Sequence, residues 1–313
     1  MATIEHMFDG LARLTLPLPM RPSHVHCYLL EGEDGGWTLV DTGLALPELE
    51  EVFAQVVREL TVARIVITHF HPDHVGGAQQ AQAATGATVH QGQLDYEQCA
   101  HVWGNDDWLQ VIADWFLANG VPPAVANELL EAGSVYAPFI RYVRDPELLH
   151  PGDVVDGWEV VATPGHADGH LALVRDGVLV AGDHLLPRIT PAVGLYPDSR
   201  PDPLGDYLDS LERTAALGLR LALPGHGEPM DDPSARAREI VAHHRARLEE
   251  TAAALGTEPR TGYEVSYPLF GADLNPAARR FAVAETLSHL ERLVREGGAQ
   301  RHEAAGALSY TET

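Results

Sequence analysis

The sequence predicts a mixed α/β (α+β) protein in which one large domain is followed by a helical C-terminal segment. Two observations support this fold class. Short apolar runs of strand length alternate with longer stretches whose apolar residues recur at helical spacing. Apolar residues make up 45% of the 313 residues, which suffices for a sizeable hydrophobic core. We expect the first domain at residues 1–232 and the second at residues 233–313.

The first third of the chain is predicted to form strands and one long helix. Strand-like runs occur at residues 11–18, 25–30 and 37–40, and the last leads into the motif Asp-Thr-Gly at residues 41–43. A helix is expected from residue 47 to about residue 60. The apolar residues 65–67 then predict a short buried strand, and a small strand is expected around residues 88–89.

The segment from about residue 93 to about residue 145 is predicted to be mainly helical and rich in aromatic side chains. These aromatic residues are Trp103, Trp108, Trp115, Phe116, Tyr136, Phe139 and Tyr142. We interpret the segment as a helical insertion that forms a lid with an apolar wall, suited to an acyl chain or another hydrophobic group. The alternative is that its aromatic side chains simply fill the insertion's own core.

The second half of the first domain is predicted to return to strands, at residues 159–162, 171–174, 178–181 and 220–223, with a helix at residues 203–217. Polar motifs, TPGHADGH, GDH and PGHGE, follow strands of this region, where functional loops on a rigid sheet are expected. The C-terminal segment is predicted to be helical at residues 233–255, 261–270 and 275–296. A Gly-Gly turn at residues 297–298 and a short tail end the chain.

The formal net charge of -24 comes from 45 acidic residues against 21 basic ones, and every basic residue is arginine because the sequence contains no lysine. Nucleic-acid binding normally depends on Lys and Arg side chains that neutralise phosphates. The charge balance therefore argues against a nucleic-acid partner.

The N-terminus lacks the basic start and uninterrupted apolar stretch of a signal peptide, and no run approaches the roughly 18 apolar residues of a membrane span. We therefore expect a cytoplasmic protein without a membrane partner. Cys27 and Cys99 are the two cysteines, so a disulfide framework is not expected. Stability must then come from packing or from metal.

The stretch THFHPDHVGG at residues 68–77 places three histidines and one aspartate within six residues, directly after the predicted strand 65–67. Gly76 and Gly77 permit a tight turn behind them. Imidazole and carboxylate groups suit Zn²⁺, and also Fe or Mn. The candidate ligands at strand ends are His69, His71, Asp73, His74, His166, Asp183 and His226. Seven side chains suffice for two metal ions if one carboxylate is shared.

These residues resemble the metallo-β-lactamase superfamily. The signature His-x-His-x-Asp-His is complete at residues 69–74, and the motifs VDTG, TPGH, AGDH and PGHG stand in the family's order at ordinary spacing. The resemblance covers roughly residues 10–230. It implies a four-layer αββα sandwich of two mixed sheets flanked by helices.

The resemblance also implies a role for each candidate. His69, His71 and His166 would bind the first metal ion, Asp73, His74 and His226 the second, and Asp183 would bridge the two. Asp41 of the VDTG motif would hydrogen-bond beside the ligands and fix the orientation of a histidine ring. For His170 and His184 we favour a structural or supporting role over direct ligation.

Two divalent metal ions, with Zn as first choice and Fe or Mn as alternatives, would lower the pKa of a bridging water towards 7. The resulting hydroxide would attack a carbonyl carbon, and the positive charge would stabilise the developing oxyanion. Asp73 would orient the hydroxide and pass its proton to the leaving group. The expected reaction is metal-assisted hydrolysis.

The expected substrate is a small ester or thioester, such as an acyl thioester, a hydroxyacylglutathione-like compound or a lactone. Arg188 and Tyr196 follow Asp183 in the sequence and would supply a cation and a hydroxyl group to the substrate. Two other functions stay open, because one fold carries many activities. One is a phosphodiesterase or endoribonuclease, and the other is a metal-binding winged-helix regulator without turnover.

The C-terminal segment resembles the small winged-helix-like domain of some members of this superfamily. Its helix at residues 275–296 is nearly neutral, with Arg279, Arg280, Arg292 and Arg295 against Glu285, Glu291 and Glu296. A helix that recognises DNA should be more basic. We therefore interpret the segment as a packing, lid or dimerisation element, and a homodimer stays open.

Overall fold

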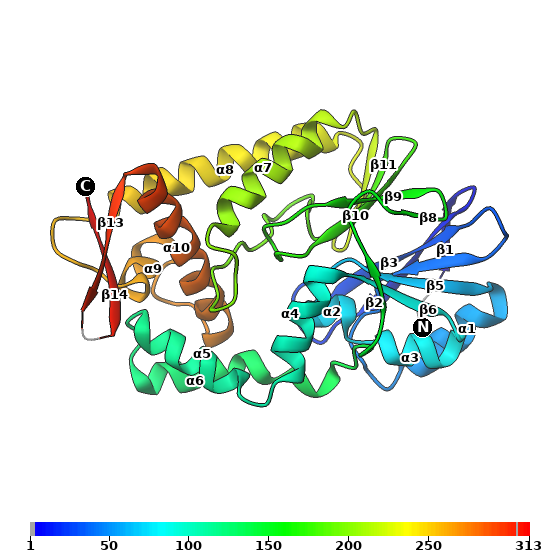
Figure 1. Ribbon diagram of the computed structural model, residues 1–313, viewed down its shortest axis with the longest axis horizontal. Helices are drawn as coiled ribbons and strands as arrows, with labels where there is room; N and C mark the ends of the chain where they lie inside the picture. Colours follow the sequence, from blue (N-terminus) through cyan, green and yellow to red (C-terminus); the bar gives the residue numbers. More distant parts are fainter. Residues whose placement is uncertain (1–3, 305) are drawn as a thin grey trace. The chain divides into compact units, whose positions relative to one another are not determined.

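The computed structural model of the chain describes residues 4–304 and 306–313 (Figure 1). These residues divide into two units. The first comprises the chain up to Gly104 together with Tyr136–Pro191 and Thr214–Arg236. The second comprises Asn105–Val135, Ala192–Arg213 and Ala237–Thr313.

The first unit contains two mixed β-sheets. The seven-stranded sheet has the order β1 (Ile4–Phe8), β2 (Leu11–Pro17), β3 (His24–Glu31), β4 (Trp37–Val40), β5 (Val62–Ile67), β6 (Thr88–Gly92) and β7 (Glu147–Leu149). The pairs from β1 to β4 are antiparallel, and those from β4 to β7 are parallel. The five-stranded sheet has the order β12 (Leu221–Pro224), β11 (Val178–Gly182), β10 (Leu171–Arg175), β9 (Trp158–Ala162) and β8 (Val154–Val155).

The core of the first unit lies on both faces of the seven-stranded sheet. On one face, side chains such as Tyr28, Val40 and Val66 pack against Trp158 and Val180 of the five-stranded sheet. On the other face, the sheet is covered by α1 (Leu49–Glu59) and α3 (Ala78–Thr85). Because both faces are covered, the central strand β3 is buried at every position except its two ends.

The loops that carry the predicted ligands follow strands of these two sheets. The Asp-Thr-Gly motif follows β4, and the histidine cluster with the short helix α2 (Pro72–Val75) follows β5. His166 lies between β9 and β10, Asp183 follows β11, and His226 follows β12. Side chains far apart in the sequence therefore come from the ends of paired strands.

Gly76 and Gly77 are required for a reason other than the predicted tight turn. Neither has a positive φ. A Cβ atom on Gly77 would lie 2.4 Å from the carbonyl oxygen of Thr42, and one on Gly76 would lie 2.3 Å from that of Pro72. The Gly77 amide donates to the Gly43 carbonyl at 2.7 Å. The two glycines thus let the ligand loop pack directly on the backbone of the Asp-Thr-Gly motif.

The second unit is mainly helical. It contains α5 (Trp108–Ala118), α6 (Pro123–Ser134), α9 (Gly262–Phe270), α10 (Pro276–Glu296) and an antiparallel hairpin of β13 (Ala299–Ala304) and β14 (Ala307–Glu312). Helix α10 is buried over most of its length and contacts α6, α9 and β13. Helices α7 (Pro203–Ala216) and α8 (Pro233–Ala253) each contain a boundary between the units.

The described structure differs from the sequence expectations at the helical insertion and at the C-terminal tail, and it adds strands β1, β7 and β8. The predicted helical insertion is divided, because α4 (Gln93–Gly104) and the 3₁₀ turn Ala137–Phe139 belong to the first unit whereas α5 and α6 belong to the second. Of its aromatic side chains, Trp103, Tyr136, Phe139 and Tyr142 pack in or against the core of the first unit. The expected short C-terminal tail forms the β13–β14 hairpin. Within the described residues, no helix has both the length and the apolar character needed to cross a membrane.

Candidate metal centre

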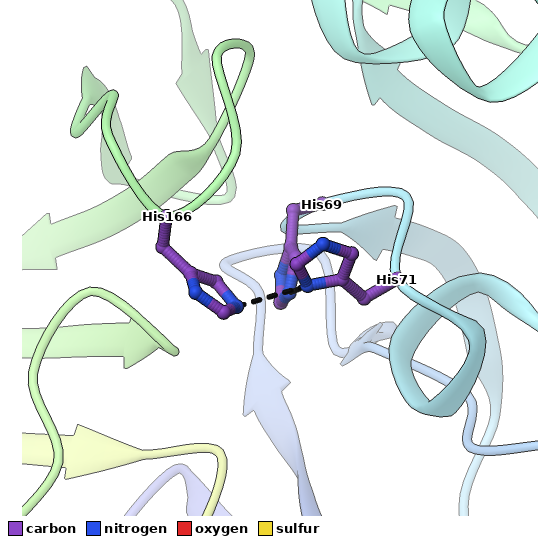
Figure 2. A group of neighbouring side chains, drawn as sticks. All are labelled: His69, His71 and His166. Atoms are coloured by element: carbon purple, nitrogen blue, oxygen red, sulfur yellow. Dashed lines mark hydrogen bonds between the residues drawn. The ribbon is translucent and has the colours of Figure 1, made fainter. Parts of the chain in front are cut away.

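Three imidazole rings converge at the end of β5, as Figure 2 shows. His69 and His71 come from the loop after β5, and His166 comes from the loop between β9 and β10. Nδ1 of His71 lies 3.0 Å from Nε2 of His69 and 2.9 Å from Nε2 of His166. His69 is fully buried, whereas the other two are partly buried.

The tautomer of His69 is set by its neighbours. The hydroxyl of Thr68 donates to the Asp41 carboxylate at 2.8 Å, so its oxygen accepts from Nδ1 of His69 at 3.0 Å. Nε2 of His69 then carries a lone pair and points at Nδ1 of His71. Nitrogen atoms that gather in this way are suited to a shared cation.

A second group is formed by Asp73, His74 and His226, whose candidate ligand atoms lie within 4.8 Å of one another. Nε2 of His226 is 3.2 Å from the Asp73 carboxylate. Nδ1 of His226 donates to the carbonyl of His24 at 2.7 Å, and Nδ1 of His74 donates to Asp41 at 2.8 Å. Both rings therefore turn an unprotonated Nε2 towards the carboxylates when they are neutral.

Asp183 lies beside side chains of both groups. Its carboxylate oxygens are 3.7 Å from Nε2 of His166, 3.4 Å from Nε2 of His226 and 3.5 Å from Nε2 of His74. Asp183 also forms a third possible metal-binding group, together with His69 and His74. All seven candidate ligands named from the sequence are thus brought to one end of the two sheets.

The donor set fits divalent metal ions. Nε2 of His74 and Oδ1 of Asp183 are buried, and neither has a hydrogen-bond partner among residues 4–304 and 306–313. Buried polar atoms without partners cost free energy, which a bound cation would recover. Nitrogen and carboxylate donors without thiolate suit Zn, Fe or Mn.

The two groups differ in their electrostatics. Burial, reinforced by the neighbouring His166, lowers the pKa of His71 to about 3. Burial and the other histidines likewise hold the pKa of His69 well below its ordinary value. For His226, burial is outweighed by the carboxylates of Asp183 and Asp73, which raise its pKa to about 10. The group of His69, His71 and His166 therefore presents neutral imidazoles. The group of Asp73, His74 and His226 combines histidines with carboxylates of opposite charge.

Three further polar residues support the ligand loops. Asp41, which has φ of 64°, accepts hydrogen bonds from the Thr68 amide at 2.8 Å and from His74. Nε2 of His170 accepts from the Asp183 amide at 3.2 Å, and its Nδ1 lies 2.7 Å from the Thr163 hydroxyl. His184 contacts the Thr214 hydroxyl through Nε2. Neither His170 nor His184 belongs to a possible metal-binding group of the described residues.

The two residues predicted to contact substrate fall in different units. Arg188 is exposed in the first unit. Tyr196, in the second, packs against Trp115 with ring centroids 5.6 Å apart, and the Arg280 guanidinium lies 5.8 Å from its ring centroid. Their substrate roles stay predictions.

Comparison with known proteins agrees with this arrangement. The sequence profile of the metallo-beta-lactamase superfamily matches residues 20–226. A second profile, that of the metallo-beta-lactamase-like C-terminal domain, matches residues 248–313. The chain therefore belongs to the metallo-beta-lactamase superfamily, and the predicted four-layer αββα fold is confirmed. Membership in this family, together with the histidine and aspartate cluster, supports a metal-dependent hydrolase.

Similar proteins match over nearly the whole chain. The probable metallo-hydrolase YqjP of Bacillus subtilis is 27% identical over 310 residues, which cover 92% of this chain and 93% of the relative. The crystal structure of a metallo-beta-lactamase family protein from Thermus thermophilus is 36% identical, with a TM-score of 0.85, and the match covers 98% of this chain and all of that one. A beta-lactamase domain protein from Burkholderia ambifaria is 30% identical, with a TM-score of 0.88 and coverage of 99% and 94%.

Proposed function

We propose that the chain is a dimetal hydrolase that cleaves an ester or thioester bond of a small molecule. The observation that carries this proposal is the meeting of two ligand groups at one carboxylate. His166 of one group and His226 of the other both lie within 4 Å of the same oxygen of Asp183. A carboxylate placed in this way can serve two cations at once.

The ligand assignment follows the two groups. His69, His71 and His166 would hold one divalent ion, Asp73, His74 and His226 would hold the other, and Asp183 would contact both. Zn is the first choice, with Fe or Mn as alternatives. Once bound, the metal ions would supply Lewis acidity, acidify water near neutral pH and polarise the bond to be cleaved.

Asp73 has the proton-handling role in this proposal. Burial opposes its ionisation, but the adjacent His74 and His226 lower its pKa, so the group is a carboxylate at neutral pH. A carboxylate in this position can accept a hydrogen bond from the attacking water, which orients the water for attack. It can take up the proton that the water loses on attack and later pass that proton to the leaving alkoxide or thiolate.

The net charge of the chain favours an acyl substrate over a nucleic acid. A chain with net charge of -24 and no lysine offers little attraction to a polyphosphate backbone. An uncharged or weakly charged ester or thioester does not need such attraction. In this proposal, Arg188 supplies a cation to the substrate.

The test is a turnover assay with metal-reconstituted protein. Short acyl thioesters, esters and lactones are assayed beside single-stranded RNA, and Asp73→Asn protein is the control in each assay. We expect thioester or ester cleavage that is lost in the control. Cleavage of RNA alone would overturn the acyl assignment, and absence of turnover from protein that holds two metal ions would favour a regulator.

A further inference from the structure

Helix α4 contacts the two loops that carry His69, His71 and His166. Asp95, in the first turn of the helix, is fully buried. Its Oδ1 accepts a hydrogen bond from the backbone amide of Phe70 at 2.9 Å, and its Oδ2 accepts one from the side-chain amide of Gln91 at 2.6 Å. Phe70 is the residue between the ligands His69 and His71, so Asp95 holds the backbone from which both imidazoles extend.

The last turn of the same helix holds the other polar group of Phe70. Nε1 of Trp103 donates to the Phe70 carbonyl at 2.9 Å. Both backbone hydrogen-bonding groups of Phe70 are therefore satisfied by α4, through two side chains eight positions apart in the sequence. The peptide units on either side of Phe70 cannot turn unless these bonds break.

The second ligand loop, residues 166–170, packs on the same helix. Nε2 of Gln98 donates to the carboxylate of Asp168 at 2.9 Å. A Cβ atom on Gly169 would lie 2.2 Å from the backbone nitrogen of Asp95, so only glycine allows the loop to approach the helix this closely. The loop of His166 and the loop of His69 and His71 are thus both fastened to one rigid element.

We infer that Asp95 is a positioning residue, which with Gln98 and Trp103 fixes the spacing between His166 and the His69–His71 pair for metal binding. The inference rests on the proposed function. A metal site requires its donors to be held within about 0.5 Å of the productive geometry. Groups that orient ligands from outside the coordination shell typically change metal affinity by about 10–100-fold.

The chain offers variants that separate positioning from general stability. Asp95→Ala removes both acceptors. Asp95→Asn keeps one oxygen for the Phe70 amide, and its new amide group can face Gln91 once that side chain turns its own oxygen inward. Tyr96→Phe is a matched control, because the Tyr96 hydroxyl donates to the carbonyl of Arg144 and not to a ligand loop.

The measurement is the affinity of full-length protein for Zn²⁺, obtained by competition with a chromogenic chelator, together with the visible spectrum of Co²⁺-loaded protein. We expect Asp95→Ala to weaken the affinity of the site that contains His69 and His71 by about 10–100-fold and to change the Co²⁺ spectrum. Asp95→Asn and Tyr96→Phe should stay close to the unmodified chain in both readouts.

Unchanged Zn²⁺ affinity and an unchanged spectrum in Asp95→Ala would overturn the inference, as would an equal loss in Tyr96→Phe. If Asp95→Ala does not fold, Trp103→Phe takes its place, because this variant removes a single donor to Phe70. Metal affinity in Trp103→Phe equal to that of the unmodified chain would then overturn the inference. Failure of the proposed function is seen separately, as an unmodified chain that binds fewer than two ions or shows no ester or thioester turnover.

Discussion

The carboxylate of Asp41 and Nδ1 of His74 lie 2.8 Å apart, and both side chains are buried. Asp41 also accepts from the amide and the hydroxyl of Thr68, so it reaches His74 and, through Thr68, His69. His69 belongs to the group with His71 and His166, His74 belongs to the group with Asp73 and His226, and both lie in the third group with Asp183. One carboxylate outside both groups therefore sets the protonated nitrogen of a histidine in each.

Asp41→Asn should disturb the group that contains His74. If the new amide nitrogen faces His74, it donates, so the ring must accept through Nδ1 and carry its proton on Nε2, where it cannot bind a cation. We expect Zn²⁺ affinity at this group to fall by about 10–100-fold. Metal titration checks this, with Asp34→Asn as a control at an exposed loop carboxylate. Two ions held with unchanged affinity would contradict it.

His71→Ala and Asp183→Ala should lower metal content to different extents. His71 belongs to the group with His69 and His166. The Asp183 carboxylate lies close to His166 of that group and to His226 of the other group. We expect His71→Ala to retain one ion and Asp183→Ala to retain less than one at the same free metal concentration. Elemental analysis after dialysis, alongside activity, measures this. Full activity in a variant shown to lack one metal ion would rule out the dimetal mechanism.

Asp73→Asn should reduce turnover far more than stability. The substitution keeps the shape of the side chain but removes the negative charge that accepts and returns a proton. We expect kcat to fall by about 10²–10⁴-fold, the usual contribution of general acid–base catalysis. The midpoint of thermal unfolding should change by only a few degrees. An unchanged rate with both metal ions retained would remove Asp73 from the mechanism.

Glu285 should make the second unit less stable as the pH rises. Burial raises its pKa to about 7 from 4.5, and Arg247 only partly opposes this. Between these values the folded chain binds more protons than the unfolded chain, so the free energy of unfolding falls as the pH rises. Glu285→Gln removes this dependence. We expect it to be more stabilising at pH 8 than at pH 5, by about 2 kcal/mol.

Denaturant unfolding at the two pH values measures that difference. The nearby histidines have the opposite effect, because burial lowers the pKa of His244 to about 3 and of His289 to about 4. Below pH 6.5 the unfolded chain binds protons at these histidines while the folded chain keeps them neutral, so the free energy of unfolding falls as the pH falls. These histidines are present in both the unmodified chain and Glu285→Gln, so their contribution to the free energy of unfolding cancels in the comparison. A Glu285→Gln effect equal at pH 5 and pH 8 would refute the assignment.

Deleting the chain after residue 232 should unfold the second unit. Helix α10 is its most buried helix and packs against α6, so removal of α10 exposes apolar surface of the remaining helices. We expect poor solubility and rapid proteolysis within residues 105–135. Limited proteolysis followed by mass spectrometry locates the cuts. A truncated protein of unchanged stability that has selectively lost RNA or DNA binding would instead support a nucleic-acid role for the tail.

The sequence predicted the elements that have strong local patterns. Runs such as residues 65–67 and 178–181 are apolar and buried in the structure. Helix α10 is capped by Asn275 at its start and by Gly297, which has φ of 76°, at its end. Strands β7 and β8 were missed because three and two residues are too few to show a period. Strand β13 was missed because its residues are mostly polar and exposed, and its hairpin partner β14 was missed with it.

The site was partly visible in the sequence. The sequence motifs contain the seven side chains that the fold brings together. They could be found because histidine and aspartate directly after a predicted strand are recognisable in the local sequence. Asp95 was missed because an acidic residue in the first turn of a helix usually faces solvent and favours the helix dipole. Its burial depends on Gly169 and Phe70, which lie far from it in the sequence, and no periodicity reveals such contacts.

The candidate ligands extend from His69 to His226, which is about half of the chain. During synthesis every nascent chain that ends before β12 lacks the last ligand, and β12 must pair in parallel with β11 before His226 takes its place. The second ligand group, which contains His226, is therefore completed after the group of His69, His71 and His166. Each metal ion that binds the folded chain and not the unfolded chain would stabilise the fold further and so lengthen its lifetime against proteases.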